Sequence, residues 1–309
     1  MTKDVFFNII SLKGEQGMKK TREMDTRDSL KVVTDNSFIV SNGLSKVSLK
    51  ARKLLYLTIA QCRVNDDEFC ECHIKVPEFA RIMEIDPSNV YQEAFNITKE
   101  LAAATLTYLP DNGDEFEHLP VVSFCKYAKN VISIELNKRM TDLLLKLRGN
   151  FSQPLLSDFM RMRSPYSMAI WHLMQREMKS KKPGVTKRIE FYVSLEELRH
   201  VTGCEDKLRQ LSEFKQRVFD KALREIAENC SVEITYTNHK ESRTVVGFDC
   251  VASNPLGLDL SQYQPAEKTK NKIRRFELQE EAKRRELTEQ EKKEYESLCS
   301  NIEQLRLDL

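Results

Sequence analysis

Arginine and glutamine side chains recur between residues 207 and 228, with a spacing that suits contact with DNA bases. Phe214, Val218, Ala222 and Ile226 follow one another at intervals of four, which predicts a helix buried along one side. Arginine can bind guanine, and glutamine adenine, through two hydrogen bonds. The outward side chains on this stretch are Arg209, Gln210, Lys215, Gln216, Arg217, Lys221 and Arg224. We therefore interpret it as a candidate base-reading helix, with Arg217 and Gln216 as the main readers.

Glu213 and Asp220 lie among these bases, and an exposed helix of alternating charge is often no more than a solvated face. A second basic feature favours DNA contact. The predicted hairpin after the helix carries His239, Lys240 and Arg243 near its tip, where phosphates could be reached. Two basic features close together in the sequence strengthen the prediction of a DNA-binding surface.

The first half of the chain holds a weaker polar set. A helix is predicted over residues 88–104, and its outer side carries Asn89, Tyr91, Gln92 and Lys99. This side is less basic, so we expect weaker or backbone-only DNA contact there. An amphipathic helix over residues 48–63 is predicted to hold Lys46, Lys50 and Lys53 on its polar side. These lysines suit either phosphate contact or a solvated basic face.

Catalytic patterns find no support in the sequence. A strand-nicking enzyme needs a pair of metal-binding histidines near a nucleophilic tyrosine, whereas the five histidines of this chain are isolated from one another. A nucleotide-binding enzyme needs a glycine-rich phosphate loop, and the nine glycines form none. Cys70, Cys72 and His73 cluster without a second group to complete a metal site, so we interpret the cysteines as partly buried thiols on a strand. We expect no enzyme activity, no metal and no cofactor.

The amino-acid composition predicts a folded protein and favours a location in the cytoplasm. The 309 residues are 40% hydrophobic and 31% charged, with a net charge of only +2, so nucleic-acid affinity depends on where the bases sit. Eight scattered cysteines without a secretory signal favour a reducing cytoplasm. Because no apolar run approaches the roughly 20 residues that span a bilayer, no membrane role is expected.

One order of elements occurs twice along the chain: helix, strand, short helix, turn, long helix and β-hairpin. In the first half the strand is predicted at residues 70–76, the short helix at 77–83 and the hairpin at 119–136. In the second half a helix begins at Ser164-Pro165, a strand covers 189–193, and Ser194 and Glu197 open a short helix closed by Gly203. This order predicts an α+β fold of two tandem winged helix-turn-helix domains.

Four regions follow from this pattern. Residues 1–30 are predicted to be a mobile arm, and residues 31–150 a first winged-helix domain for dimerisation and accessory DNA contact. Residues 151–255 form the principal DNA-reading domain, with the boundary near Asn150, beside Gly149 and Pro154. Residues 256–309 are predicted to be a charged, helical tail, because they are dense in Glu, Lys and Arg, and their sparse apolar residues do not sustain the heptad repeat of a coiled coil.

Residues 42–252 resemble the iteron-binding plasmid replication initiators, in particular those of the F-plasmid type. The resemblance rests on three segments in the expected order: SLKARKLLYLTIAQ from Ser48, FSQPLLSDFMRMRSPYSMAIWHLM from Phe151 and LRQLSEFKQRVFDKALREI from Leu208. It implies a cytoplasmic bacterial protein that binds direct repeats at a plasmid origin. It also implies origin opening by monomers, recruitment of the host replication initiator and replicative helicase, and autorepression by dimers.

The resemblance places the family's base-contacting arginines on residues 210–217. Where the F type has an aromatic residue followed by three arginines, this chain has Phe214 followed by Lys215, Gln216 and Arg217. A different repeat sequence is therefore expected. Two alternatives stay open at this point: a plasmid or phage transcriptional repressor with the same fold, and winged helices that bind only proteins.

Overall fold

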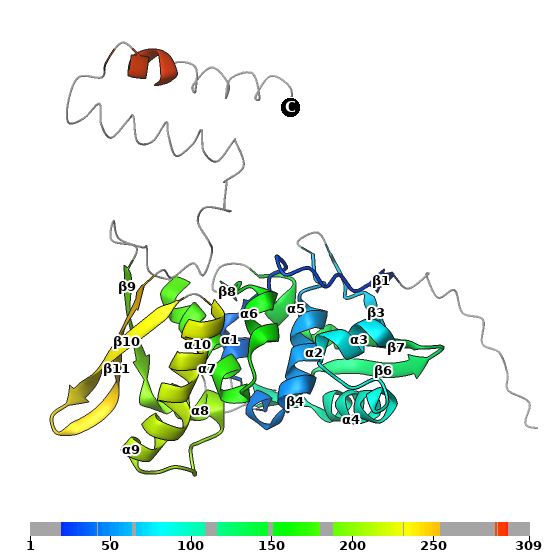
Figure 1. Ribbon diagram of the computed structural model, residues 1–309, viewed down its shortest axis with the longest axis horizontal. Coiled ribbons are helices and arrows are strands. Elements are labelled where there is room, and N and C mark those ends of the chain that lie inside the picture. Colours follow the sequence, from blue (N-terminus) through cyan, green and yellow to red (C-terminus); the bar gives the residue numbers. More distant parts are fainter. Residues whose placement is uncertain are drawn as a thin grey trace, which may run out of the picture. The chain divides into compact units, whose positions relative to one another are not determined.

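The computed structural model describes residues 20–41, 43–63, 66–108, 116–147, 151–179, 188–230, 232–253, 288 and 290–295. Two compact units are separated at residue 255, and the first holds both predicted winged helices. Figure 1 shows the helices and strands. Both repeats of the predicted order are present, so the α+β fold with two winged helices is confirmed.

The first winged helix surrounds a buried helix, α2 (Leu49–Ile59). Ser48 caps its start by accepting a hydrogen bond from the Ala51 N–H, as a serine before a helix commonly does. Every residue from Ala51 to Ile59 is buried, because α4 (Val90–Ala103) and α6 (Leu156–Arg161) both pack against it. A helix is therefore confirmed at this place, whereas its predicted basic side is wrong, since α2 is a core helix.

A four-stranded sheet completes this winged helix, in the order β1-β3-β7-β6. Its strands are β1 (Thr21–Glu23), β3 (Glu71–Lys75), β6 (Val122–Ala128) and β7 (Val131–Leu136). Between β3 and β6 the chain forms α3 (Val76–Ile82), α4 and a small pair, β4 (Thr105–Tyr108) with β5 (Glu117–Pro120). On β3, Cys72 is buried while the neighbouring His73 bonds Glu71 at 3.0 Å, so the two side chains have different surroundings.

The second winged helix repeats the pattern with a three-stranded sheet, in the order β10-β11-β9. Its elements are α7 (Pro165–Lys179), β9 (Arg188–Ser194), α8 (Leu195–Thr202), α9 (Leu211–Phe214), η3 (Lys215–Phe219), α10 (Asp220–Cys230), β10 (Glu233–Glu241) and β11 (Thr244–Ser253). Ser194 caps α8 by accepting from the Glu197 N–H, and Gly203 ends it with a φ of +64°. Both signals were read from the sequence.

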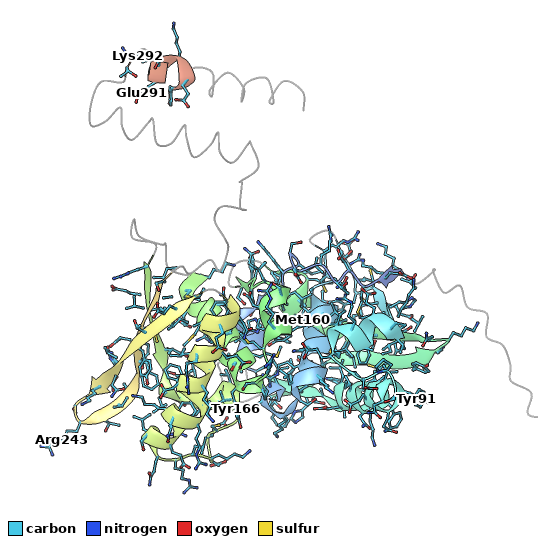
Figure 2. The ribbon with its side chains drawn as sticks, in the orientation of Figure 1. Tyr91, Met160, Tyr166, Arg243, Glu291 and Lys292 are labelled. Carbon is cyan, nitrogen blue, oxygen red and sulfur yellow. The ribbon has the colours of Figure 1, made fainter. Side chains whose placement is uncertain are left out.

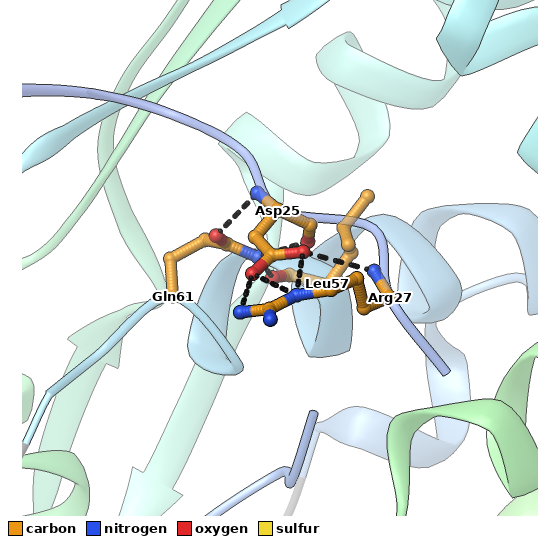
Figure 3. A network of polar contacts seen from close by, with 4 residues as sticks. All are labelled: Asp25, Arg27, Leu57 and Gln61. Atoms are coloured by element: carbon orange, nitrogen blue, oxygen red, sulfur yellow. Dashed lines mark hydrogen bonds and ion pairs between the residues drawn. The ribbon is translucent and has the colours of Figure 1, made fainter. Parts of the chain in front are cut away.

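Residues 20–30 depart from the prediction of a mobile arm reaching residue 30. Strand β1 pairs in parallel with β3, and Met24 is buried. Figure 3 shows the contact that follows: the Gln61 side-chain amide donates to the carbonyls of Asp25 and Leu57, each at 2.9 Å. The Asp25 N–H donates to Gln61 in return, at 2.8 Å, so the predicted arm is wrong for residues 20–30.

Several short elements lie outside the two winged helices, and some of them contact the second one. They are β2 (Thr34–Asp35), α1 (Asn36–Ile39), η1 (Leu44–Lys46), η2 (Lys138–Met140), α5 (Thr141–Leu144) and β8 (Phe151–Ser152). Strand β8, which pairs with β2, begins directly after Asn150, the expected boundary, which itself lies outside the described residues. The buried side chains of both halves form one continuous core. The domain limits given above therefore stay a prediction.

A buried histidine lies where α2, α7, β2 and β8 meet. The ring of His172, on α7, is 2.9 Å from the Tyr56 hydroxyl, 3.0 Å from the Thr34 hydroxyl and 3.2 Å from that of Ser152. Burial, with a smaller effect of the charges of Arg52 and Arg176, lowers the pKa of His172 to about 3. The imidazole is therefore neutral in the folded protein.

This burial predicts a loss of stability in acid. The folded pKa lies below the ordinary value of about 6.5, so the unfolded chain binds the proton more readily and the stability from His172 is lost as pH falls from about 6.5 towards 3. The advantage of the native chain over His172→Gln should shrink by about 1 kcal/mol per pH unit below pH ~6. Chemical unfolding of both chains measures this. A difference that stays constant with pH would contradict it.

In the second unit only residues 288 and 290–295 are described, and residues 290–295 are helical. The Thr288 side chain caps them, accepting from the Glu291 N–H at 3.4 Å. The rest of the predicted helical tail lies outside the described residues. Among the residues that the structure describes, no helix has both the length and the apolar character needed to cross a membrane.

Candidate nucleic-acid interface

The candidate interface is a helix-turn-helix formed by α8 and the helix of residues 211–230. The second helix begins at Leu211, later than the predicted residue 207, because residues 204–210 form the turn. Gln210 is the N-cap and makes no side-chain capping bond, which leaves its amide for other partners. The main predicted readers thus lie on the second helix, the one that enters the major groove in such motifs.

The predicted apolar stripe of this helix is buried, and it fixes which side faces outward. Phe214, Val218, Ala222 and Ile226 are at most 2% exposed, and Phe219 and Leu223 join them. The predicted DNA-contacting residues of this domain that are exposed are Arg209, Gln210, Gln216, Arg217, Lys221, Lys240 and Arg243. The side predicted to face DNA is therefore free of packing within the described chain.

Arg217 and Gln216 lie in η3, a π-helical segment in the middle of the helix. Such segments are rare and often mark functional positions. The Arg217 side chain is 63% exposed and forms an ion pair with Glu213, at 3.2 Å. An exposed pair of this kind contributes about 0–1 kcal/mol, so a guanine or phosphate can displace it at small cost.

Lys215 departs from the prediction that it stands beside the base readers. Its ammonium lies 4.8 Å from the centre of the Tyr236 ring, 5.7 Å from that of Phe248 and 3.3 Å from the Asn238 side-chain oxygen. All three partners belong to the β10–β11 hairpin, so Lys215 links the helix to the wing. The direction of the Lys215 side chain could not be predicted from the sequence, because its partners lie on β10 and β11, more than 20 residues further along the chain.

Further contacts fix the wing against the helix. The Tyr236 hydroxyl donates to Asp220 at 2.7 Å, and the Phe219 ring stacks on Phe248 with centres 4.6 Å apart. The hairpin projects beyond these contacts, with Arg243 near its end (Figure 2). His239 pairs with Gly247, short of the tip where Glu241 pairs with Thr244, and it bonds Asp249 across the strands at 3.0 Å. Lys240 and Arg243 remain the exposed basic residues of the wing.

Sequence reasoning missed Arg199, which organises the turn. Its guanidinium donates to the carbonyls of Cys204 and Leu208 at 3.0 Å, and to those of Lys207 and Arg209 at 3.1 Å. The same group lies 4.7 Å from the centre of the Phe214 ring. The one signal in the sequence was an arginine near the end of a helix followed by a turn rich in polar residues, which is too common to single out.

The first winged helix presents a different surface. Asn89, Gln92 and Lys99 are exposed on or beside α4, as predicted, but the Gln92 amide donates to Asn96 at 3.1 Å. Large aromatic side chains lie among them: Tyr91 is 64% exposed and Phe95 54%. With Lys99 and Tyr127 they line a shallow groove between α4 and β6. This face is aromatic as much as basic, which suits weaker contact with phosphate than the second domain offers.

The two predicted lysines of α2 do not form a basic face. Lys53 is 7% exposed and donates to the carbonyl of Met160 at 2.6 Å, so its assignment to phosphate contact is wrong. Burial lowers the pKa of Lys53, consistent with an ammonium taken up by the core. Lys50 is half-exposed and pairs with Glu93 at 2.7 Å, which neutralises its charge.

Comparison with known proteins identifies the fold and the family. Residues 31–175 match the family described as initiator replication protein, WH1, and residues 194–249 match initiator Rep protein, WH2. The chain belongs to the initiator replication protein family. A solved structure with the same fold is described as the crystal structure of Pi initiator protein in complex with iteron DNA. It aligns with a TM-score of 0.61 and 20% identity, over 74% of this initiator and 98% of that chain.

Proposed function

We propose that this initiator binds direct repeats, or iterons, at a plasmid origin in the bacterial cytoplasm and starts replication there. The observation that carries the proposal is the exposed row of side chains that begins with Arg209 and Gln210, just before the second helix of the helix-turn-helix in the WH2 domain, and continues on that helix with Gln216 and Arg217. In such motifs this helix enters the major groove and its side chains reach base edges.

The remaining predicted contacts surround this row. Lys221, Lys240 and Arg243 reach the phosphate backbone from the helix and the wing, which positions the protein without reading sequence. Asn89, Gln92 and Lys99 supply weaker, accessory contact from the first domain, whereas Lys50 is already paired with Glu93. The protein acts by binding and opening DNA, not by catalysing a covalent step.

Two further parts of the proposal follow from family membership. The first winged helix serves as the dimer surface, so that dimers repress the initiator's own promoter while monomers act at the origin. Monomers recruit the host replication initiator and the replicative helicase. A transcriptional repressor with the same fold is the alternative, and membership of the initiator family favours the initiator.

The DNA-binding part is tested by titrating full-length protein against a direct-repeat duplex from the origin region and against a shuffled duplex of equal composition. Binding of the repeat should be at least about a thousand-fold tighter. It should also weaken steeply as salt rises, because phosphate contacts release counterions. Equal affinity for the two duplexes would reject sequence recognition and favour the protein-binding alternative.

The initiator part needs a separate measurement. The coding region and its adjacent repeats are cloned on a vector that has no origin of its own, and persistence in the host is followed. We expect the vector to be maintained, and maintenance to fail when the repeats are shuffled. Tight repeat binding without maintenance would assign the chain to repression.

A further inference from the structure

A single side chain, that of Arg199, binds the turn between α8 and the helix of residues 211–230, which we call the reading helix. All four guanidinium hydrogens on the two terminal nitrogens of Arg199 point at main-chain carbonyls, those of Cys204, Lys207, Leu208 and Arg209. A guanidinium presents its donors in a fixed planar fork, so it sets the positions of these carbonyls relative to one another. The turn is therefore held from inside, by a residue on the preceding helix.

The conformation of the turn needs such support. Leu208 has a φ of +50°, which a non-glycine residue adopts only when its surroundings impose it. Arg199 binds the Leu208 carbonyl and those on both sides of it, and its guanidinium also lies over the ring of Phe214, in the first turn of the helix. One planar group thereby joins α8, the strained turn and the first turn of the reading helix.

We infer that Arg199 is a specificity-determining positioning residue, which aims Arg209 at the DNA by fixing the backbone from which its side chain leaves. The inference rests on the proposed function. Arg209 lies in the turn, one residue before the N-cap, and its carbonyl is one of the four that Arg199 binds. Arg217 lies further along the helix, where the buried Val218 and Phe219 hold the backbone independently of the turn. Arg199 therefore acts on the contact of Arg209 and not on that of Arg217.

Lysine is the informative replacement. Arg199→Lys keeps the charge, but a single ammonium has three donors and no planar face to lie on Phe214. It cannot hold four carbonyls. If Arg199 positions Arg209, the lysine variant should leave Arg209 with little to contribute to DNA binding, even though Arg209 itself is unchanged.

The test is a pair of double-mutant cycles on full-length protein. The probe is the consensus duplex that the native protein selects from a pool of duplexes with a randomised core. Arg209→Ala should weaken binding about fivefold or more in the native background and less than about twofold beside Arg199→Lys. Arg217→Ala should weaken binding equally in both backgrounds. Equal effects of Arg209→Ala in the two backgrounds would overturn the inference.

A matched control separates positioning from general destabilisation. Ile226→Val weakens the core of the same helix far from the turn, since Ile226 is fully buried on α10. In that background Arg209→Ala should keep its full effect. An equal loss of the Arg209 effect beside Ile226→Val would assign Arg199 a merely structural role.

A second variant keeps the test informative if Arg199→Lys does not melt cooperatively. Leu208→Gly removes the cost of the positive φ, so it is added to Arg199→Lys to restore folding. In this double background the guanidinium is still absent, so the effect of Arg209→Ala should again be reduced, and an undiminished effect would overturn the inference. Native protein that selects no consensus at all would instead reject the proposed function, so the two failures are distinguishable.

Discussion

Replacing Arg217 by alanine should weaken binding to the selected duplex by about 1–3 kcal/mol and relax base preference at one position of the site. The reason is the bidentate contact that an exposed arginine can make with guanine, offset only by the loss of its ion pair with Glu213. Selection from a randomised duplex pool, repeated with native and variant protein, measures the preference. An unchanged preference would show that another side of the helix faces the bases.

Arg224→Ala is the matched control for this prediction. Arg224 is an exposed arginine on the same helix, two turns further on, and its Nε donates to the Asp220 carbonyl at 3.3 Å. Because the N-terminal part of a recognition helix meets the base edges, removing Arg224 should leave the base preference as it is. A change in preference for both variants would mean that charge alone, and not the contact of Arg217, decides the selection.

The largest effect on stability is expected for Gly43→Ala, which should cost about 3 kcal/mol or more. Gly43 has a φ of +116°, a conformation that side chains rarely adopt, and an added Cβ would collide with the carbonyl oxygen of Thr105. That oxygen belongs to the backbone where β4 begins, so it cannot move aside cheaply. Thermal or chemical unfolding of the variant measures the loss.

Gly203→Ala gives the comparison. Gly203 has a φ of +64°, where alanine costs about 1–2 kcal/mol, and its added Cβ would meet the Ser45 side chain at 3.0 Å. Since a serine side chain can turn, the destabilisation should be smaller than for Gly43. Equal losses for the two variants would mean that the collision with Thr105 adds nothing to backbone strain.

The order of the elements could be predicted because it depends on local patterns. The stripe from Phe214 to Ile226 gave the reading helix and its buried side, and Ser194 and Gly203 gave the two ends of α8. Periodicity and capping are properties of neighbouring residues, so a single sequence carries them. The side of the recognition helix that remains exposed followed from the same stripe.

The errors arose where distant residues decide the outcome. Lys53 was predicted to lie on the polar side of a helix, yet it is buried, and the carbonyl that accepts its hydrogen bond belongs to Met160, more than 100 residues away. The pairing of β1 with β3, such as Thr21 with Glu71, also joins residues distant in the sequence and has no local signature. In the site, the direction of the Lys215 side chain depends on the β10–β11 hairpin. The role of Arg199 depends on the conformation of the turn that it binds. Neither conformation can be predicted from the local sequence pattern.

The central claim is that the polar side of the reading helix lies in a duplex groove. It is tested most directly by placing a short photo-crosslinker at residue 216 and, as a control, at Tyr192, which is exposed on the sheet of the same domain. With the selected duplex bound, residue 216 should crosslink to a base at one defined position, and residue 192 should not crosslink to DNA. Crosslinks from residue 192 but not from residue 216 would contradict the account.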